Sequence, residues 1–394
     1  MKRLLVILSC LILVYRVAGK EQERTLYFYG DTLKFKYADT PPLTFNNVVT
    51  PENIYRFWSK MNAAHYNIIV DSLLTYRTRT QPDDWVFYQL IRKVAQQVCP
   101  KETDYNSYTL HKWYLLNKCG YNATLNITDN KLLLYVQSDE TIYDIPFYKR
   151  DNKQYICLNF HDHTGIDVKA HPFTEVPAQL PGAVMSFSYQ LKRMPNFAPS
   201  EYQEKELDFS YNDKSYVFRV KVPPAIQSIY KNYPVADYKL YFNAPLSTET
   251  YNTLIPQLKK HVKGMTVKNG VDYLMRFTRY AFLYQPDVEQ FGKEKRMSPE
   301  QTLLSDKSDC EDRAALFYCL VKEIYNLPMV VIEFPHHLTI AVKFEKPVGK
   351  PIYYNGAAYT VCEPTPQQQE LGMGELSYDL THQRYSIALA YDPQ

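Results

Sequence analysis

The sequence predicts an α+β protein in which a helix that begins with a cysteine is followed by an antiparallel sheet. Apolar residues recur at helical spacing after Cys310. Three strand-like runs follow, at 327–332, 337–344 and 359–362. A similar order of helix and then strands occurs earlier in the chain. A small antiparallel β domain is expected between the two.

The first 19 residues predict a secretory signal. Lys2 and Arg3 precede an apolar run at 4–15, and Val17-Ala18-Gly19 forms a small-residue cleavage site. The run is too short to span a bilayer, and no later stretch predicts a membrane span. We therefore expect a secreted or periplasmic protein.

Composition and charge narrow the function classes. Three of the basic residues, Lys2, Arg3 and Arg16, lie in the predicted signal, so the formal net charge of +3 falls to zero for the mature chain. Without a basic cluster, nucleic acid is not an expected partner. A chain of 394 residues with 36 tyrosines indicates two or three well-packed domains.

The cysteines do not form a disulfide framework or a zinc motif. Seven occur, Cys10 lies in the signal, and no Cys-x-x-Cys pair is present. His161-Asp162-His163 is weakly metal-like, but two histidines without a third partner favour a solvated loop. We expect no metal and no cofactor.

Residues 20–165 form the first predicted domain. A hairpin is expected over 25–37 around Gly30-Asp31, and Thr50-Pro51-Glu52 is typical of a helix start. The further predicted elements are helices near 65–76, 83–98 and 105–119, then strands at 123–127, 132–136 and 155–159.

Residues 166–246 predict the antiparallel β domain. The expected strands are 183–191, 204–211, 214–222 and 237–242, with Asn212-Asp213 as a tight turn.

Residues 247–394 form the last predicted domain. Helices are expected at 248–262 and 271–283 before the cysteine helix. Asn355-Gly356 indicates a hairpin turn, and 385–391 is expected to add a strand to the sheet.

The local sequence places Cys310 in the first turn of its helix, with Ser308 or Asp309 as the N-cap. The positive end of the helix dipole favours a thiolate there. The negative charges of the neighbouring acidic residues, Asp309, Glu311 and Asp312, disfavour the thiolate. An acidic thiol is therefore not expected unless an imidazole lies beside it.

A histidine and a carboxylate follow Cys310 along the chain. His337 begins the second strand-like run, and Glu363 directly follows the third. Thiol, imidazole and carboxylate are the groups of a nucleophile, a general base and a group that orients the base.

Four motifs carry a family resemblance. They are Asp-Cys-Glu-Asp-Arg-Ala-Ala-Leu, Tyr-Asn-Leu-Pro-Met-Val-Val, Pro-His-His-Leu-Thr-Ile-Ala-Val and Cys-Glu-Pro-Thr. In this order they resemble a bacterial transglutaminase-like domain of the papain-like cysteine superfamily, over about 254–365. The resemblance implies a transglutaminase-like core in the last domain.

The resemblance also implies roles for single residues. Cys310 is the nucleophile, and His337 is the base rather than His336 because it fits the pattern Pro-x-His-x-x-x-Ala-Val. Glu363 stands where the family more often has Asp. The resemblance further suggests Tyr284 or Gln285 as support for the oxyanion.

The implied function is cleavage or transfer of an amide or peptide acyl group, with a peptide or protein amide as substrate. Hydrolysis is slightly favoured, but the three residues act alike in both reactions. The alternative is an inactive transglutaminase-like scaffold that serves as a binding or assembly protein. The sequence leaves the oligomeric state open.

An internal repeat is a further hypothesis. Leu110 aligns with Leu316 at an offset of 206 residues, and Tyr155 aligns with Tyr359 at 204. In this alignment, the first copy is degenerate and non-catalytic: it has Asp104, Lys131 and Asn159 where the second has Cys310, His337 and Glu363. The alternative is two unrelated segments that share a helix-then-strand order.

Overall fold

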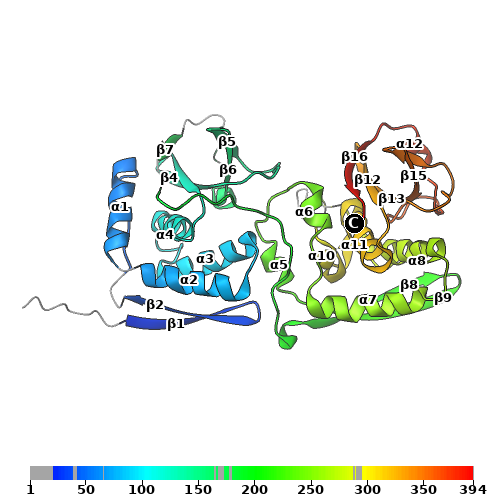
Figure 1. The fold of residues 1–394 in the computed structure, drawn as a ribbon, viewed down its shortest axis with the longest axis horizontal. Coiled ribbons are helices and arrows are strands. Elements are labelled where there is room, and N and C mark those ends of the chain that lie inside the picture. Colours follow the sequence, from blue (N-terminus) through cyan, green and yellow to red (C-terminus); the bar gives the residue numbers. More distant parts are fainter. Residues whose placement is uncertain are drawn as a thin grey trace, which may run out of the picture.

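The computed structural model describes residues 21–393 except 39–41, 65, 164–165, 167–172, 177–179, 287–288 and 290–294. The predicted signal at 1–19 lies outside the described residues. Helices and antiparallel sheets alternate along the chain, which confirms the α+β class. Figure 1 shows two bodies side by side, each with a hairpin, a layer of helices and a sheet.

The first body contains the predicted hairpin around Gly30-Asp31, the predicted helices and the three predicted strands. Thr50 caps its first helix by accepting a hydrogen bond from the N–H of Asn53, and Pro51 is the first helical residue. The elements are β1 (Glu21–Phe28), β2 (Asp31–Ala38), α1 (Pro51–Ala63), α2 (Asn67–Thr80), α3 (Asp84–Val98), α4 (Tyr105–Lys118), β3 (Ala123–Thr128), β4 (Lys131–Gln137), β5 (Phe147–Arg150), β6 (Lys153–Cys157) and β7 (Thr174–Val176).

The second body begins with a hairpin and ends with a strand that joins its sheet. Its elements are β8 (Gln203–Tyr211), β9 (Lys214–Val222), α7 (Thr248–Val262), α8 (Val267–Tyr280), β10 (Leu283–Tyr284), α10 (Pro299–Leu304), β11 (Lys307–Ser308), α11 (Cys310–Tyr325), β12 (Met329–Phe334), β13 (His337–Val342), β14 (Ile352–Tyr354), β15 (Ala357–Cys362), α12 (Tyr378–Thr381) and β16 (Ser386–Tyr391). Asn355 and Gly356 have positive φ in the β14–β15 turn, as expected.

The two larger sheets have the same strand order. The first runs β5-β6-β4-β3-β7 and the second β14-β15-β13-β12-β16. Their registers also agree. The pair Leu125–Leu134 corresponds to Val331–Ile340 at an offset of 206 residues, and Tyr148–Tyr155 corresponds to Ile352–Tyr359 at 204. These are the two offsets of the repeat hypothesis.

The expectation of a separate β domain at 166–246 is wrong. β7 joins the edge of the first sheet, where it pairs with β3. The β8–β9 hairpin packs against α7 and α8 of the second body. A two-stranded hairpin needs such a partner, because by itself it is only marginally stable.

The prediction of a strand at 183–191 is also wrong, although buried and more exposed residues alternate along the segment. It forms only an isolated bridge between Met185 and Tyr121 and one bond from the N–H of Phe187 to the carbonyl of Gln137 at the end of β4.

Other backbone groups of this segment bond to side chains. The N–H of Ser188 donates to an Asp84 carboxylate oxygen, and the N–H of Tyr189 to one of Glu140.

The strand expected at 237–242 is instead the short helix α6 (Tyr238–Phe242). Asp237 caps it by accepting from the N–H of Lys239. Tyr238, Leu240, Tyr241 and Phe242 are all buried, so the segment never had the alternating pattern of a half-exposed strand.

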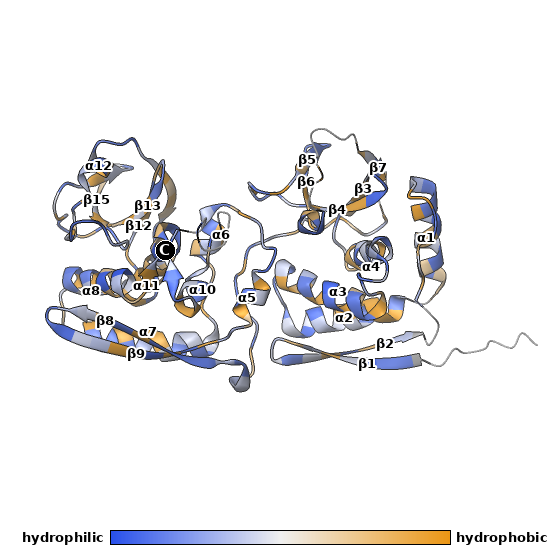
Figure 2. Ribbon diagram, turned by 180° about the vertical axis from the view of Figure 1, so that it is seen from behind, coloured by the Kyte–Doolittle hydropathy of each residue, from blue (hydrophilic) through white to orange (hydrophobic). Residues whose placement is uncertain are grey.

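One hydrophobic core extends through both bodies, from Phe28 to Cys362. Figure 2 shows apolar residues on the helices and strands that face it. The segment with α5 (Ile226–Ile229) and α6 joins the bodies: the indole N–H of Trp85 donates to the carbonyl of Ile229 at 2.6 Å.

None of the helices in the described part of the chain combines the length and the apolarity needed to cross a membrane.

Because the core is closely packed, truncating a buried side chain of the cysteine helix should strongly lower the stability of the fold. Leu316 is fully buried in α11, so Leu316→Ala should lower the free energy of unfolding by about 2–5 kcal/mol. Urea denaturation measures this change. Lys259→Ala, at an exposed position of α7, is the control and should have little effect. Equal effects of the two changes would contradict the packing.

Candidate active site

The start of α11 places Cys310 as its first helical residue. Asp309 is the N-cap, and one of its carboxylate oxygens accepts from the N–H groups of Glu311 at 3.0 Å and Asp312 at 3.2 Å. Just before the cap, β11 pairs with β10. Of the two caps considered from the sequence, Asp309 is the one used.

The thiol of Cys310 is largely shielded but not fully buried. Helix α11 packs against β13, and the backbone N–H of Leu338 on that strand interacts with the sulfur. Burial raises the pKa of the thiol, and the negative charge of Asp309 raises it further, whereas the Leu338 N–H acts against them. The resting cysteine is therefore a neutral thiol.

His337 and Glu363 form a close pair. Nε2 of His337, the first residue of β13, lies 2.7 Å from Oε2 of Glu363, the residue after β15. Glu363 is fully buried, and its second oxygen accepts from the N–H of Thr365 at 2.8 Å. Because Nε2 is engaged, Nδ1 remains for a second partner.

The pair affects the basicity of the imidazole. Burial lowers the pKa of His337, but the hydrogen bond and charge of Glu363, with a contribution from Asp309, raise it above its ordinary value overall. His336, by contrast, is exposed in the turn between β12 and β13. Of the two neighbouring histidines, only His337 is paired with the buried carboxylate.

Tyr284 and Gln285 lie beside the start of α11. Tyr284 pairs with Ser308 in the β10–β11 ladder, and the N–H of Gln285 donates to the Ser308 carbonyl at 3.3 Å. The Tyr284 side chain is half exposed. Burial raises the pKa of its phenol, and negative charge at Cys310 (when the thiol is ionised) and at Asp309 raises it further, so the phenol stays protonated.

Two buried arginines hold these parts together. Arg313 of α11 donates to the Ser308 hydroxyl at 3.0 Å and to the carbonyls of Arg279 at 2.6 Å and Phe282 at 2.9 Å. Arg279 of α8 donates to the Glu363 carbonyl and to that of Leu371. The cysteine helix, α8 and the carboxylate are thereby connected.

Neither arginine was assigned a role from the sequence. Arg279 lies in an amphipathic helix, where an arginine is usually exposed. Arg313 is part of the motif around Cys310, but the motif alone gives it no partner. Most partners of the two side chains are backbone carbonyls that only the fold brings within reach.

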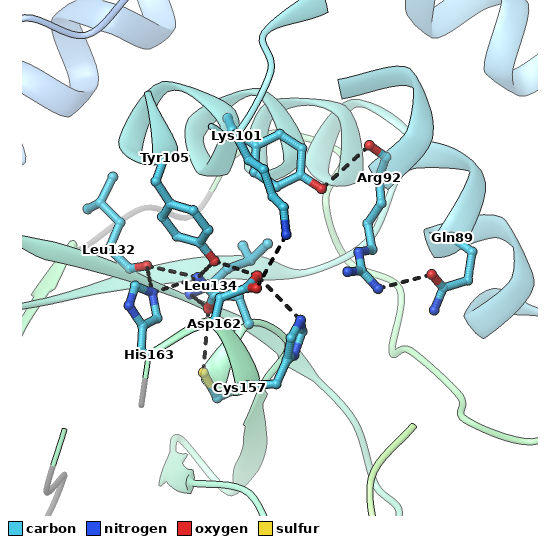
Figure 3. A network of polar contacts seen from close by, with 12 residues as sticks. Gln89, Arg92, Lys101, Tyr105, Leu132, Leu134, Cys157, Asp162 and His163 are labelled. Atoms are coloured by element: carbon cyan, nitrogen blue, oxygen red, sulfur yellow. Dashed lines mark hydrogen bonds and ion pairs between the residues drawn. The ribbon is translucent and has the colours of Figure 1, made fainter. Parts of the chain in front are cut away.

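The first body has different chemistry at the corresponding places. Asp104 is the N-cap of α4, and Lys131 is exposed at the start of β4. Asn159 is fully buried, and its Nδ2 lies 3.2 Å from the Tyr105 hydroxyl and 3.2 Å from Nε2 of His163. Figure 3 shows this network. It contains the thiol of Cys157, the imidazole of His163 and the carboxylate of Asp162, but the Cys157 thiol donates to Oδ1 of Asn159, whose amide lies between the thiol and His163.

The weak metal motif does not form a site. Nε2 of His161 pairs with Asp162 at 3.3 Å, whereas Nε2 of His163 lies near the Leu132 carbonyl. Within the described ranges, no three side chains of His, Cys, Asp or Glu gather closely enough to bind a metal ion. All six cysteines of these ranges are free thiols.

No family model, curated protein or solved structure matches the chain. The function proposed for the chain therefore rests on its residues and their geometry.

Replacing Glu363 with Gln keeps a hydrogen-bond acceptor but removes the charge that raises the pKa of His337. The folded pKa lies above the ordinary value of about 6.5. The stability that the pair contributes is therefore fully present below that value and is lost as pH rises through the folded pKa. We expect the difference in unfolding free energy between wild type and Glu363→Gln to be largest near pH 6 and to shrink toward about pH 9.

Urea denaturation across this pH range measures the difference. His336→Gln, at the exposed neighbour, is the control and should show no such pH dependence. A difference that grows with pH would contradict the raised pKa of His337.

Arg279→Met should destabilise the protein, because two buried carbonyls lose their donors. At about 1–3 kcal/mol for each unsatisfied group, we expect a loss of about 2–5 kcal/mol. Arg276→Met, one helical turn earlier, is a matched control: its ion-pair partners, Glu370 and Asp272, are both accessible to solvent, and the loss should stay below about 1 kcal/mol. Similar losses in the two variants, measured by urea denaturation, would show that Arg279 does not brace the site.

Proposed function

We propose that the chain is an exported, transglutaminase-like cysteine enzyme that cleaves or transfers an amide or peptide acyl group. The supporting observation is the His337–Glu363 pair, with Nε2 and Oε2 2.7 Å apart, on the strand whose next residue contacts the Cys310 sulfur. The helix that begins with Cys310 packs against the strand that begins with His337, which supports a role for all three residues in one site.

The geometry suits the proposed roles. Glu363 binds Nε2 of His337, which fixes the tautomer and leaves Nδ1 as the proton acceptor. Only the thiol and the imidazole reach the surface, since Glu363 is fully buried. The acid is Glu rather than the more frequent Asp of the family, and the Thr365 N–H and Arg279 hold its longer side chain and its backbone in place.

In the proposed reaction, Nδ1 of His337 takes the thiol proton as the Cys310 sulfur attacks the carbonyl carbon. The C–N bond then breaks, and the imidazolium returns the proton to the leaving amine. Water or a second amine resolves the thioester, which gives hydrolysis or acyl transfer. The protonated hydroxyl of Tyr284, a half-exposed residue within electrostatic reach of Cys310, is the proposed donor to the oxyanion, with the Cys310 N–H.

The two pKa directions favour general-base catalysis over a thiolate–imidazolium pair formed in advance. The thiol is held neutral, and the imidazole is a stronger base than usual. Activity should therefore be low where His337 is already protonated. It should rise with pH as His337 loses its proton.

The repeat is part of the same proposal. The shared strand order and registers support a first body derived from the same transglutaminase-like core. Asp104, Lys131 and Asn159 replace the reactive set there. The first body would then be a non-catalytic copy, and the second the active one.

Cys310→Ala should lower turnover of casein, used as an unfolded protein substrate, by about 10³-fold or more. Cys319→Ala is the matched control: this thiol is buried in the same helix, and its loss should leave turnover nearly unchanged. Iodoacetamide labelling with peptide mapping gives a second readout that needs no substrate. Labelling of Cys310 should rise with pH and should fall at least about tenfold in His337→Ala.

Labelling that is equally fast in His337→Ala would refute the proposed base. Together with an absence of casein turnover, it would favour the alternative of an inactive scaffold that binds a partner. The raised pKa and the shielding of the thiol are the observations that favour this alternative.

A further inference from the structure

A cavity of about 860 Å³ lies between the two bodies. We call it the interbody cavity. Its walls come from the end of β6 and the residues that follow in the first body, from the segment around α5 and α6, and from Lys295 and Arg296. Its volume is typical of sites that bind small molecules.

One wall of the cavity is a rigid aromatic cluster. The rings of Trp85, Tyr189 and Tyr233 lie with centroids 5.2–5.9 Å apart. Hydrogen bonds fix two of them: Trp85 donates to the Ile229 carbonyl, and Tyr233 donates to the Tyr189 carbonyl at 2.7 Å. Fixed aromatic faces favour a ligand with a planar, largely apolar body.

The hydroxyl of Tyr189 has no hydrogen-bond partner among the described residues, although the side chain is only 1% exposed. Such a buried, unpaired hydroxyl destabilises a fold by about 1–3 kcal/mol. Tyr189 is one of the residues that line the cavity, so a ligand acceptor there could satisfy this hydroxyl after a small movement of the ring. This second observation does not depend on the shape of the cavity.

The charged residues of the lining are mostly basic. Lys231, Lys295 and Arg296 face one carboxylate, that of Asp144, which accepts from the N–H of Val235 at 2.7 Å. Arg296 shares its charge with Glu311 at 3.2 Å. Lys231 lies exposed on the lining, and its positive charge favours an anionic group on the ligand.

The cavity borders the first body at the place that corresponds to the catalytic edge of the second. Cys157 and Leu158 line it, and the next residue, Asn159, occupies the position of Glu363. Behind this wall, Asp162 is already held by the Tyr105 hydroxyl at 2.9 Å and by Lys101, as Figure 3 shows. These polar groups stabilise the wall and are not available for chemistry.

We propose that the interbody cavity is a binding site for a small organic anion that carries a planar ring. The aromatic wall takes the ring, the Tyr189 hydroxyl donates to an acceptor on the ligand, and Lys231 at the exposed mouth attracts the anionic group. This site is separate from the thiol chemistry and stands whether or not Cys310 is a nucleophile.

The test is a fluorescence titration of the folded full chain with 8-anilinonaphthalene-1-sulfonate, an aromatic sulfonate. We expect one saturable site per chain, with energy transfer to the dye that decreases in Trp85→Phe. Lys231→Glu should raise the Kd at least about tenfold. Lys214→Glu, an exposed lysine on the β8–β9 hairpin, is the control and should leave the Kd within about twofold.

Two further variants separate binding from folding. Val235→Trp should narrow the cavity on its lining and weaken saturable binding. Tyr189→Phe should weaken binding several-fold without lowering the thermal midpoint of the free protein, because the removed hydroxyl has no partner there. A structural role alone would lower the midpoint instead.

Benzoate should compete with the dye, whereas uncharged benzyl alcohol should compete much more weakly. Dye binding that does not saturate, or that is equal in Val235→Trp and wild type, would place the dye on exposed aromatic surface and overturn the proposal.

Discussion

Two buried guanidinium groups hold the candidate site together. Taking a guanidinium out of water is unfavourable unless its donors are satisfied. Arg313 and Arg279 meet this condition through carbonyls and a hydroxyl contributed by four different segments. Because a guanidinium is planar and its donors have fixed directions, these bonds set the position of α11 relative to the end of β15. This constraint keeps the Glu363 charge within electrostatic reach of Cys310.

The same strand order supports different chemistry in the two bodies. In the second, a fully buried carboxylate lies next to an imidazole at the edge of the sheet. In the first, a neutral amide, Asn159, occupies the corresponding place and bonds to the backbone of β4 on both of its sides. A buried neutral amide needs no charged partner. The position that corresponds to His337, which is Lys131, therefore does not have to be a histidine.

Much of the fold could be predicted because its signals are local. The hairpin at Gly30, the cap at Thr50 and the cysteine helix each depend on a few neighbouring residues. Segment 183–191 could not be predicted, since alternation shows an extended chain but not whether another strand lies beside it. The segment that became α6 has five residues, of which only Lys239 is exposed, so it is too short and too apolar to show a period that separates helix from strand.

For the site, the order of Cys310, His337 and Glu363 was visible in the sequence, but their surroundings were not. The direction of the thiol pKa depends on burial and on the distance to Asp309, both properties of the packed structure. The bracing arginines and the interbody cavity likewise depend on contacts between residues far apart in the chain. Sequence motifs predict which groups are present, whereas packing decides their protonation.

The continuous core limits how the sequence of the chain can evolve. Trp85 of the first body and the tyrosines around α5 and α6 are buried by residues from both bodies. If either half were deleted, this aromatic surface would be exposed to water, which favours aggregation. A half that lost its reactive residues would therefore still be kept by selection, as a packing partner that the other half needs in order to remain soluble.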